Sequence, residues 1–174
     1  AILADAVSTP FGAVVRTANV RVGESVGVWG VGGVGTHIVQ LARLVGAAPI
    51  IAVDIKPAVL DRALDLGADY AFDARDPELI SKIAAATDGE NLNVSFDAVG
   101  VTTTFEQALA AVAVGGKLVG VGMSADTPSL GSTSDFNFGH RQVLGHLGYH
   151  NEDIGTLATL VSRGRLDLSR SISQ

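Results

Sequence analysis

A run of glycines near the start of the sequence has the spacing of a phosphate-binding turn. Its residues, Gly30-Val31-Gly32-Gly33-Val34-Gly35, follow the apolar run 25–29 with the pattern G-x-G-x-x-G. In this pattern the first glycine allows a tight turn, the second lets the backbone approach a pyrophosphate, and the third lets a helix pack closely on a strand. Free N–H groups at the start of that helix attract the anion. The run therefore predicts a strand, a phosphate-binding turn and a helix.

A carboxylate after the next apolar run gives this turn a context. The glycine pattern alone is weak evidence, because the chain contains 21 Gly. The apolar run 49–53 ends in Asp54, which lies 19 residues beyond Gly35. An acidic residue there accepts hydrogen bonds from the hydroxyls of an adenosine ribose and repels a 2′-phosphate. We therefore expect a site that prefers NAD(H) to NADP(H), although a polar strand end facing water is the simpler alternative for Asp54.

Lys56 follows two residues after this carboxylate. It could lie along the adenosine end of a bound dinucleotide. A solvated surface lysine is the other interpretation.

Strands and helices alternate along the whole chain. Apolar runs predict strands at about 25–29, 50–54, 69–72, 94–99, 117–122 and 143–148. Helical patterns with their start and stop residues predict helices at about 9–18, 38–44, 57–66, 76–86, 102–112 and 153–163, with caps at Ser8, Asp76 and 102–104. Residues 124–139 are rich in Ser, Asp, Gly and Pro and predict a surface loop. The alternation predicts an α/β fold with a doubly wound, parallel, six-stranded sheet of order 3-2-1-4-5-6, the Rossmann fold.

In this topology a ligand lies across the carboxyl ends of the strands, where strands one and four are neighbours. The ends of strands four and five carry Ala98-Val99-Gly100 and Val121-Gly122, which we expect to flank the same crevice as Gly32. Small residues there would leave room for a flat ring. Each glycine on its own could equally be an ordinary residue between strand and loop.

Composition narrows the class of protein. The chain of 174 residues is 47% hydrophobic and carries a net charge of −6, without the basic patch that nucleic-acid binding needs. It has no Cys, which excludes disulfides and thiolate zinc sites within this sequence and fits a cytoplasmic location. No apolar run is long enough for a membrane span. The sequence begins with Ala, in mid-pattern, so we expect a piece of a longer protein whose residues 1–174 form one domain.

Taken together, the motifs resemble the coenzyme-binding domain of the medium-chain dehydrogenase/reductases, in the zinc-dependent alcohol dehydrogenase branch. The resemblance covers nearly the whole chain and rests on segments 4–10, 30–35, 53–54, 66–69, 97–100 and 115–119. It implies hydride transfer between an alcohol, or the corresponding carbonyl compound, and NAD, with zinc polarising the alcohol oxygen. The cleft for that chemistry would lie between this domain and a separate catalytic domain. Residues 1–20 would lead in from that domain and residues 165–174 would begin the return to it.

The resemblance also assigns two residues near the start of the chain. Asp5 stands where the family has a ligand of the catalytic zinc, usually Cys, and a carboxylate is also an accepted zinc ligand. The other ligands would lie outside this sequence, so a simple solvated carboxylate is the alternative. Thr9 would lie against the nicotinamide, its alternative role being a hydroxyl at a helix start.

Other functions remain open at this point. The histidines, His37, His140, His146 and His150, lack the spacing of metal ligands, and no residue stands out as a general base. The rival hypotheses are a zinc-free, NADPH-dependent quinone or enoyl reductase and a non-catalytic dinucleotide-sensing module. We expect this chain to bind the cofactor without catalysing the reaction alone. We also expect a homodimer through the exposed edge of the sixth strand.

Overall fold

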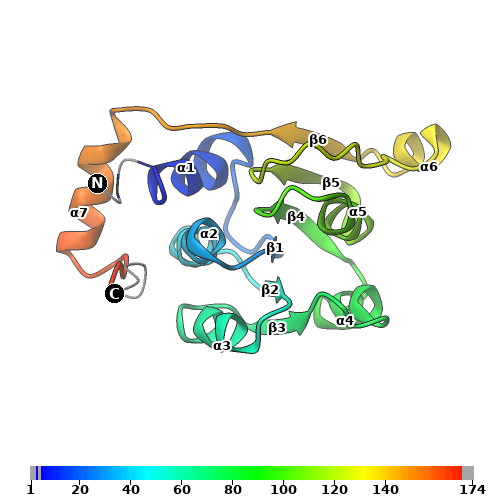
Figure 1. Ribbon diagram of the computed structural model, residues 1–174, viewed down its shortest axis with the longest axis horizontal. Coiled ribbons are helices and arrows are strands. Elements are labelled where there is room, and N and C mark those ends of the chain that lie inside the picture. The colour runs from blue at the N-terminus through cyan, green and yellow to red at the C-terminus, as the bar shows by residue number, and fades with distance from the viewer. Residues whose placement is uncertain (1–2, 4, 170–174) are drawn as a thin grey trace.

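The computed structural model describes residue 3 and residues 5–169 of the chain. In this part, six parallel strands form one sheet of order β3-β2-β1-β4-β5-β6, which confirms the predicted Rossmann topology (Figure 1). The strands are β1 (Val26–Trp29), β2 (Ile50–Asp54), β3 (Tyr70–Asp73), β4 (Leu92–Asp97), β5 (Val112–Gly120) and β6 (Gln142–Gly145).

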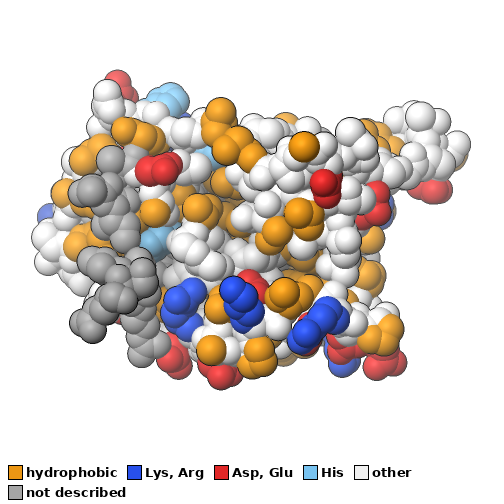
Figure 2. Space-filling model, viewed as in Figure 1, with side chains coloured by type: hydrophobic (Ala, Val, Ile, Leu, Met, Phe, Trp, Pro, Cys, Tyr) orange, Lys and Arg blue, Asp and Glu red, His pale blue; other side chains and the backbone are white. Residues whose placement is uncertain are grey.

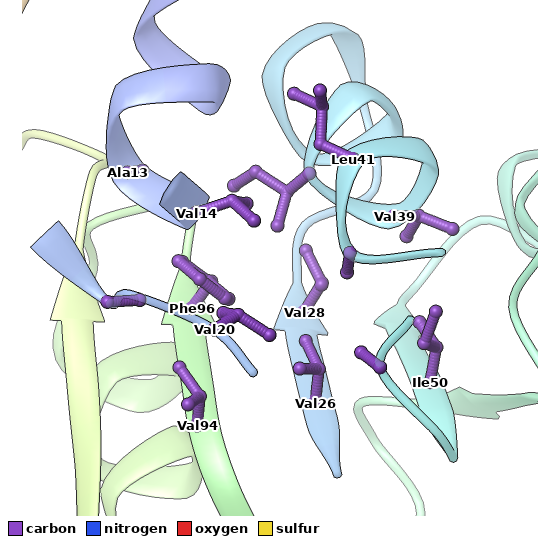
Figure 3. Packing of buried hydrophobic residues seen from close by; sticks show 14 of the residues in the cluster. Ala13, Val14, Val20, Val26, Val28, Val39, Leu41, Ile50, Val94 and Phe96 are labelled. Atoms are coloured by element: carbon purple, nitrogen blue, oxygen red, sulfur yellow. The ribbon is translucent and has the colours of Figure 1, made fainter. Parts of the chain in front are cut away.

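Helices cover both faces of the sheet. They are α1 (Ser8–Phe11), η2 (Gly12–Thr17), α2 (Gly33–Val45), α3 (Pro57–Asp65), α4 (Leu79–Ala86), α5 (Thr102–Ala110), α6 (Thr133–Phe138) and α7 (Asp153–Ser162). Two buried clusters correspond to the two faces. The larger joins α1, η2, α2, α3 and α7 to the sheet, and the smaller lies under α4 and α5. Figure 3 shows the larger cluster, where Val14 and Leu41 pack over Val28 and Phe96.

The strand register determines where the glycine turn lies. Trp29, the last residue of β1, is opposite Val53 of β2 on one side and Asp97 of β4 on the other. Because the strands are parallel, their carboxyl ends meet at one edge of the sheet. The turn that follows Trp29 therefore lies between the ends of β2 and β4, which is the switch point at which α/β sheets bind ligands.

The first helix differs from the prediction of one continuous helix at 9–18. It begins at Ser8 as α1 and continues as the π-helix η2, in which the Ala18 N–H donates to the Ala13 carbonyl at 2.8 Å. The predicted Ser8 cap is wrong, because this side chain is buried and its Oγ has no hydrogen-bond partner among the described residues. η2 is joined to the start of α7 by Arg16, which donates to the Asp153 carboxylate at 2.6 and 2.7 Å.

Three further helix and strand boundaries differ from the prediction. Part of the predicted loop 124–139 is helical, because Ser132 caps α6 by accepting from the Asp135 N–H at 3.0 Å. β5 begins at Val112 rather than near 117, since Leu92 of β4 pairs with Val112 before the register shifts. α4 begins at Leu79, so Asp76 does not cap it and instead accepts from the Glu78 N–H in the turn before it.

β6 and β3 are the two edge strands of the sheet in the described part of the chain, because β6 pairs with β5 alone and β3 with β2 alone. β6 ends at Gly145, before the predicted limit of 148. Among the helices of residues 3 and 5–169, none is both long enough and apolar enough to cross a bilayer.

A buried histidine on α2 makes the stability of this fold depend on pH. His37 is fully buried and neither ring nitrogen has a hydrogen-bond partner among the described residues. Burial, and then the charge of Arg62, lower the pKa of His37 from 6.5 to about 4. The unfolded chain therefore takes up a proton between these pH values while the native protein does not. His37 contributes its full stability above about pH 6.5 and loses it as the pH falls towards 4.

We predict that His37→Leu removes this dependence. Between pH 7 and 4.5 the wild type should lose about 2 kcal/mol more of its free energy of unfolding than the variant does, because this range covers most of a pKa difference of about 2.5. Urea unfolding at several pH values measures this difference. His140→Asn, at an exposed position, is the control and should follow the wild type. Parallel curves for the wild type and His37→Leu would contradict the prediction.

Candidate cofactor site

The glycine turn has the geometry that the pattern predicts. Gly30 has a φ of 80°, in the left-handed region, and its N–H donates to the Val53 carbonyl at 2.8 Å. A Cβ on Gly35 would lie 1.9 Å from the Gly30 carbonyl oxygen, so α2 can pack on the turn only because residue 35 is glycine. A Cβ on Gly32 or Gly33 would meet no atom within 4 Å. The turn is thus closed on its inner side and open in front of Gly32, where an anion would approach.

α2 begins at this open side. Gly33, Val34 and Gly35 form its first turn, which contains no acidic residue, and Gly32 precedes it without a side-chain cap. Unpaired backbone N–H groups and the positive end of the helix dipole therefore face outward from the turn. A phosphate group suits this environment.

Asp54 ties the end of β2 to the glycine turn. One carboxylate oxygen, Oδ2, accepts from the Val31 N–H at 3.0 Å. The other, Oδ1, accepts from the N–H groups of Ile55 at 2.8 Å and Lys56 at 3.1 Å. The predicted carboxylate and the predicted turn are therefore in direct contact, and the negative charge lies beside the turn. Lys56 is exposed.

An apolar pocket of about 280 Å³ opens beside this carboxylate. It extends from the end of β2 to the start of α5, and its walls include Trp29, Val53, Ile55, Val99 and Val101. Asp54 lies in its lining, and Arg75 lies at the same pocket, where its guanidinium pairs with Asp73 at 2.6 Å. This hydrogen-bonded Arg75 lowers the pKa of Asp73 to about 2. A flat apolar ring with a hydroxylated group next to it fits such a pocket.

The predicted small residues at the ends of β4 and β5 lie together, and their glycines serve the packing of the backbone. Gly100 has a φ of 88°, and a Cβ there would lie 2.5 Å from the Gly122 carbonyl carbon. A Cβ on Gly122 would lie 2.3 Å from the Val99 carbonyl carbon. The Val121 and Gly122 N–H groups both donate to the Asp97 carbonyl at 2.9 Å. Close packing of two backbone segments thus requires these glycines, whether or not a ring binds near Ala98.

Thr9 and Asp5 form a pair at the start of α1. The Thr9 hydroxyl donates to Asp5 Oδ1 at 3.1 Å, and Thr9 is buried. Across residues 3 and 5–169, no group of three or more His, Asp or Glu side chains is arranged to hold a metal ion. Asp5 therefore offers a single metal ligand, with one oxygen held by Thr9.

The contacts of two residues near these elements were not predicted from the sequence. Arg62, on α3, donates to the Val31 carbonyl at 3.2 Å and so reaches the glycine turn. His146, just after β6, shares a hydrogen bond of 2.8 Å with Thr17 and rests against Gly12. Burial lowers the pKa of His146. Helical spacing on α3 could place Arg62 on the side facing α2, but nothing in the sequence indicates that it would contact the turn.

The comparisons with known proteins all match this chain to dehydrogenases. Residues 33–163 match the family model described as zinc-binding dehydrogenase. An alcohol dehydrogenase of Cupriavidus necator is 29% identical over 97% of this chain, and an NADP-dependent isopropanol dehydrogenase of Entamoeba histolytica is 32% identical over 99% of it. The alcohol dehydrogenase TADH from Thermus sp. ATN1 superposes with a TM-score of 0.89 at 29% identity, covering 97% of this chain and 48% of that structure. The chain spans about half the length of these relatives, 46% and 48% of the two sequences.

The different surroundings of Gly32 and Gly35 give a matched pair of substitutions. We predict that Gly32→Ala leaves the fold intact, because the added Cβ meets no atom within 4 Å, yet weakens NADH binding by about tenfold or more by blocking the anion. Gly35→Ala should instead destabilise the protein by about 1–3 kcal/mol, the usual cost of an overpacked site. Thermal unfolding and calorimetric titration with NADH separate the two effects. Wild-type affinity in Gly32→Ala would show that no phosphate lies on this turn.

Proposed function

The chain belongs to the zinc-binding dehydrogenase family, and from this premise we propose that it is the NAD(H)-binding domain of a zinc-dependent alcohol dehydrogenase. The observation that carries the proposal is the contact between Asp54 and the Val31 N–H, which places a carboxylate beside an open glycine turn and an apolar pocket. In this assignment adenine occupies the pocket, its ribose meets Asp54, and the pyrophosphate lies at the start of α2. The enzyme would interconvert an alcohol and its carbonyl compound.

The preference for NAD(H) rests on the charge of Asp54. One relative is an NADP-dependent enzyme by its name, so family membership alone does not decide the cofactor. Among the described residues, Asp54 forms no ion pair with Lys or Arg, and Arg75 in the same pocket is paired with Asp73. An uncompensated carboxylate at the ribose would repel a 2′-phosphate.

The role of the chain in the reaction would be to bind and orient the cofactor. The nicotinamide ring supplies the hydride chemistry when the dinucleotide is bound. Thr9, together with the ends of β4 and β5, would lie against that ring. Lys56 would lie along the adenosine end.

A zinc ion would polarise the alcohol oxygen, and we assign Asp5 as one of its ligands. The described residues fit this only in part, since their His, Asp and Glu side chains form no group of three or more that could hold a metal ion. Thr9 would orient the ligand by holding Oδ1 through its hydroxyl, as outer-shell hydrogen bonds do at metal sites. The remaining ligands and the substrate pocket would come from a catalytic domain outside these residues, so this chain alone would bind cofactor without turnover.

We predict that Asp54→Asn lowers NADH affinity by about tenfold and changes NADPH affinity less. A charged hydrogen-bond acceptor contributes about 1.5–3 kcal/mol, and its loss removes both the ribose contact and the repulsion of a 2′-phosphate. Titration with NADH and NADPH at one salt concentration measures the ratio. Asp61→Asn, exposed on α3, is the control for the change in net charge.

The two cofactor affinities also separate the alternatives. A wild type that prefers NADPH would favour the zinc-free quinone or enoyl reductase. An unchanged ratio of NADH to NADPH affinity in Asp54→Asn would contradict the role assigned to this residue. Binding of NADH without turnover, even when a catalytic domain is supplied, would favour a sensing module.

We further propose a cytoplasmic homodimer in which the edge strand β6 pairs with its symmetry mate. Its outer edge has no neighbour within the described part of the sheet, and Phe138 and Val114 near it are 83% and 76% exposed. An exposed strand edge is a template for pairing. Sedimentation velocity should give twice the 17.8 kDa mass of the chain. A monomer at all concentrations up to about 100 μM would contradict this, because interfaces of the usual size hold dimers well below that.

A further inference from the structure

Arg62 extends from α3 to the glycine turn, where it contacts two acceptors. One guanidinium nitrogen donates to the Val31 carbonyl at 3.2 Å and to the Thr36 hydroxyl at 3.3 Å. Thr36, in α2, itself donates to the same Val31 carbonyl at 2.7 Å. The Asp54 carboxylate accepts from the Val31 N–H. Val31 is therefore held at its N–H by a carboxylate and at its carbonyl by a hydroxyl and a cation.

The electrostatics of this arrangement are unfavourable without a ligand. Arg62 lies beside the first turns of α2, whose amino end carries the positive end of the helix dipole and has no acidic residue in its first turn. Within the described part of the chain, Arg62 forms no ion pair with a carboxylate, and its buried Nε has no hydrogen-bond partner. A guanidinium with a desolvated nitrogen beside a positive helix end lacks the anion that would balance it.

The charge of Arg62 also affects the neighbouring His37. After burial, the charge of Arg62 is the second cause that lowers the pKa of His37, one residue after Thr36. The positive potential of Arg62 therefore extends into the amino-terminal part of α2. An anion bound at the start of this helix would lie in the same positive potential, which would stabilise the anion.

We propose that Arg62 is a positioning residue for the cofactor pyrophosphate. It holds the Val31 peptide in the conformation that leaves Gly32 open, and it adds positive charge that the two phosphates balance on binding. The inference rests on the proposed function, because the anion is the dinucleotide itself. Arg62 acts through Val31 and through the electrostatic potential, so it need not touch the ligand.

A ligand series tests this role. Adenosine fills the pocket and meets Asp54 but carries no phosphate, whereas ADP-ribose and NADH carry the pyrophosphate. In Arg62→Met we expect affinity for ADP-ribose and NADH to fall by about tenfold, and affinity for adenosine to change by less than about twofold. Arg62→Lys keeps the charge and should recover most of the loss. Binding is measured by NADH fluorescence, with adenosine and ADP-ribose as competitors.

A salt series adds a readout that a purely structural residue would not change. Increasing salt should weaken NADH binding less in Arg62→Met than in the wild type, because one interacting charge is gone. Arg43→Met is the matched control. Arg43 lies in the last turn of α2, at the opposite end of the helix from the glycine turn, and its guanidinium pairs with Asp69. It should leave the ligand series unchanged.

The outcomes distinguish this inference from the proposed function. If wild type and Arg62→Met bind NADH equally, or if adenosine loses as much affinity as NADH, the role of Arg62 is overturned while the cofactor assignment stands. If the wild type binds none of the three ligands, the proposed function itself fails and the inference fails with it. Circular dichroism and thermal unfolding of both Arg62 variants establish that they are folded. If Arg62→Met unfolds, Arg62→Gln replaces it in both series, because it also removes the charge; a tenfold loss for ADP-ribose and NADH with a shallower salt slope supports the role, and wild-type affinity and slope overturn it.

Discussion

The backbone of Val31 is the point on which the site depends. Its N–H is bound by the Asp54 carboxylate from β2, and its carbonyl is bound by Thr36 of α2 and Arg62 of α3. Three elements that follow one another in the chain are thereby fixed to the backbone of a single residue, through the two peptide groups on either side of its Cα. The register of β1 with β2 and β4 places this residue at the switch point of the sheet. The open face of Gly32 and the adjacent pocket follow from that placement.

The glycines of the site serve two separate physical needs. Gly35 and Gly100 are required by packing, because a Cβ at either position would meet backbone atoms at 1.9 and 2.5 Å. Gly32 has open space in front of it, so packing does not require glycine there. A motif with one spacing pattern in the sequence therefore combines glycines that the packing requires with glycines, such as Gly32, that it does not require. Figure 2 shows one face of the molecule, with Lys and Arg side chains in a row over its lower half.

The sequence predicted the fold more completely than the site, for physical reasons. Short apolar runs show that strands alternate with helices along the chain. Right-handed crossovers between the strands then favour this strand order. The contact between Asp54 and the turn could be anticipated because both lie at carboxyl ends of neighbouring strands. The contact of Arg62 with Val31 depends on how α3 packs against α2, and no local pattern encodes that angle. The π-helix η2 was missed for a similar reason, since tertiary contacts of Arg16 and Thr17 accompany a wider turn that helix propensity does not report.

The state of the Asp54 carboxylate bears directly on how it could select a cofactor. A carboxylate offers about four acceptor positions, and three backbone N–H groups occupy three of them here. The remaining position can accept from one ribose hydroxyl, so the carboxylate would contribute a single charged hydrogen bond to the ribose. The charge is not paired with any Lys or Arg of the described chain. Selection between a hydroxyl and a phosphate at this position would therefore combine that hydrogen bond with electrostatic repulsion of the phosphate, and the backbone N–H groups hold the charge in place.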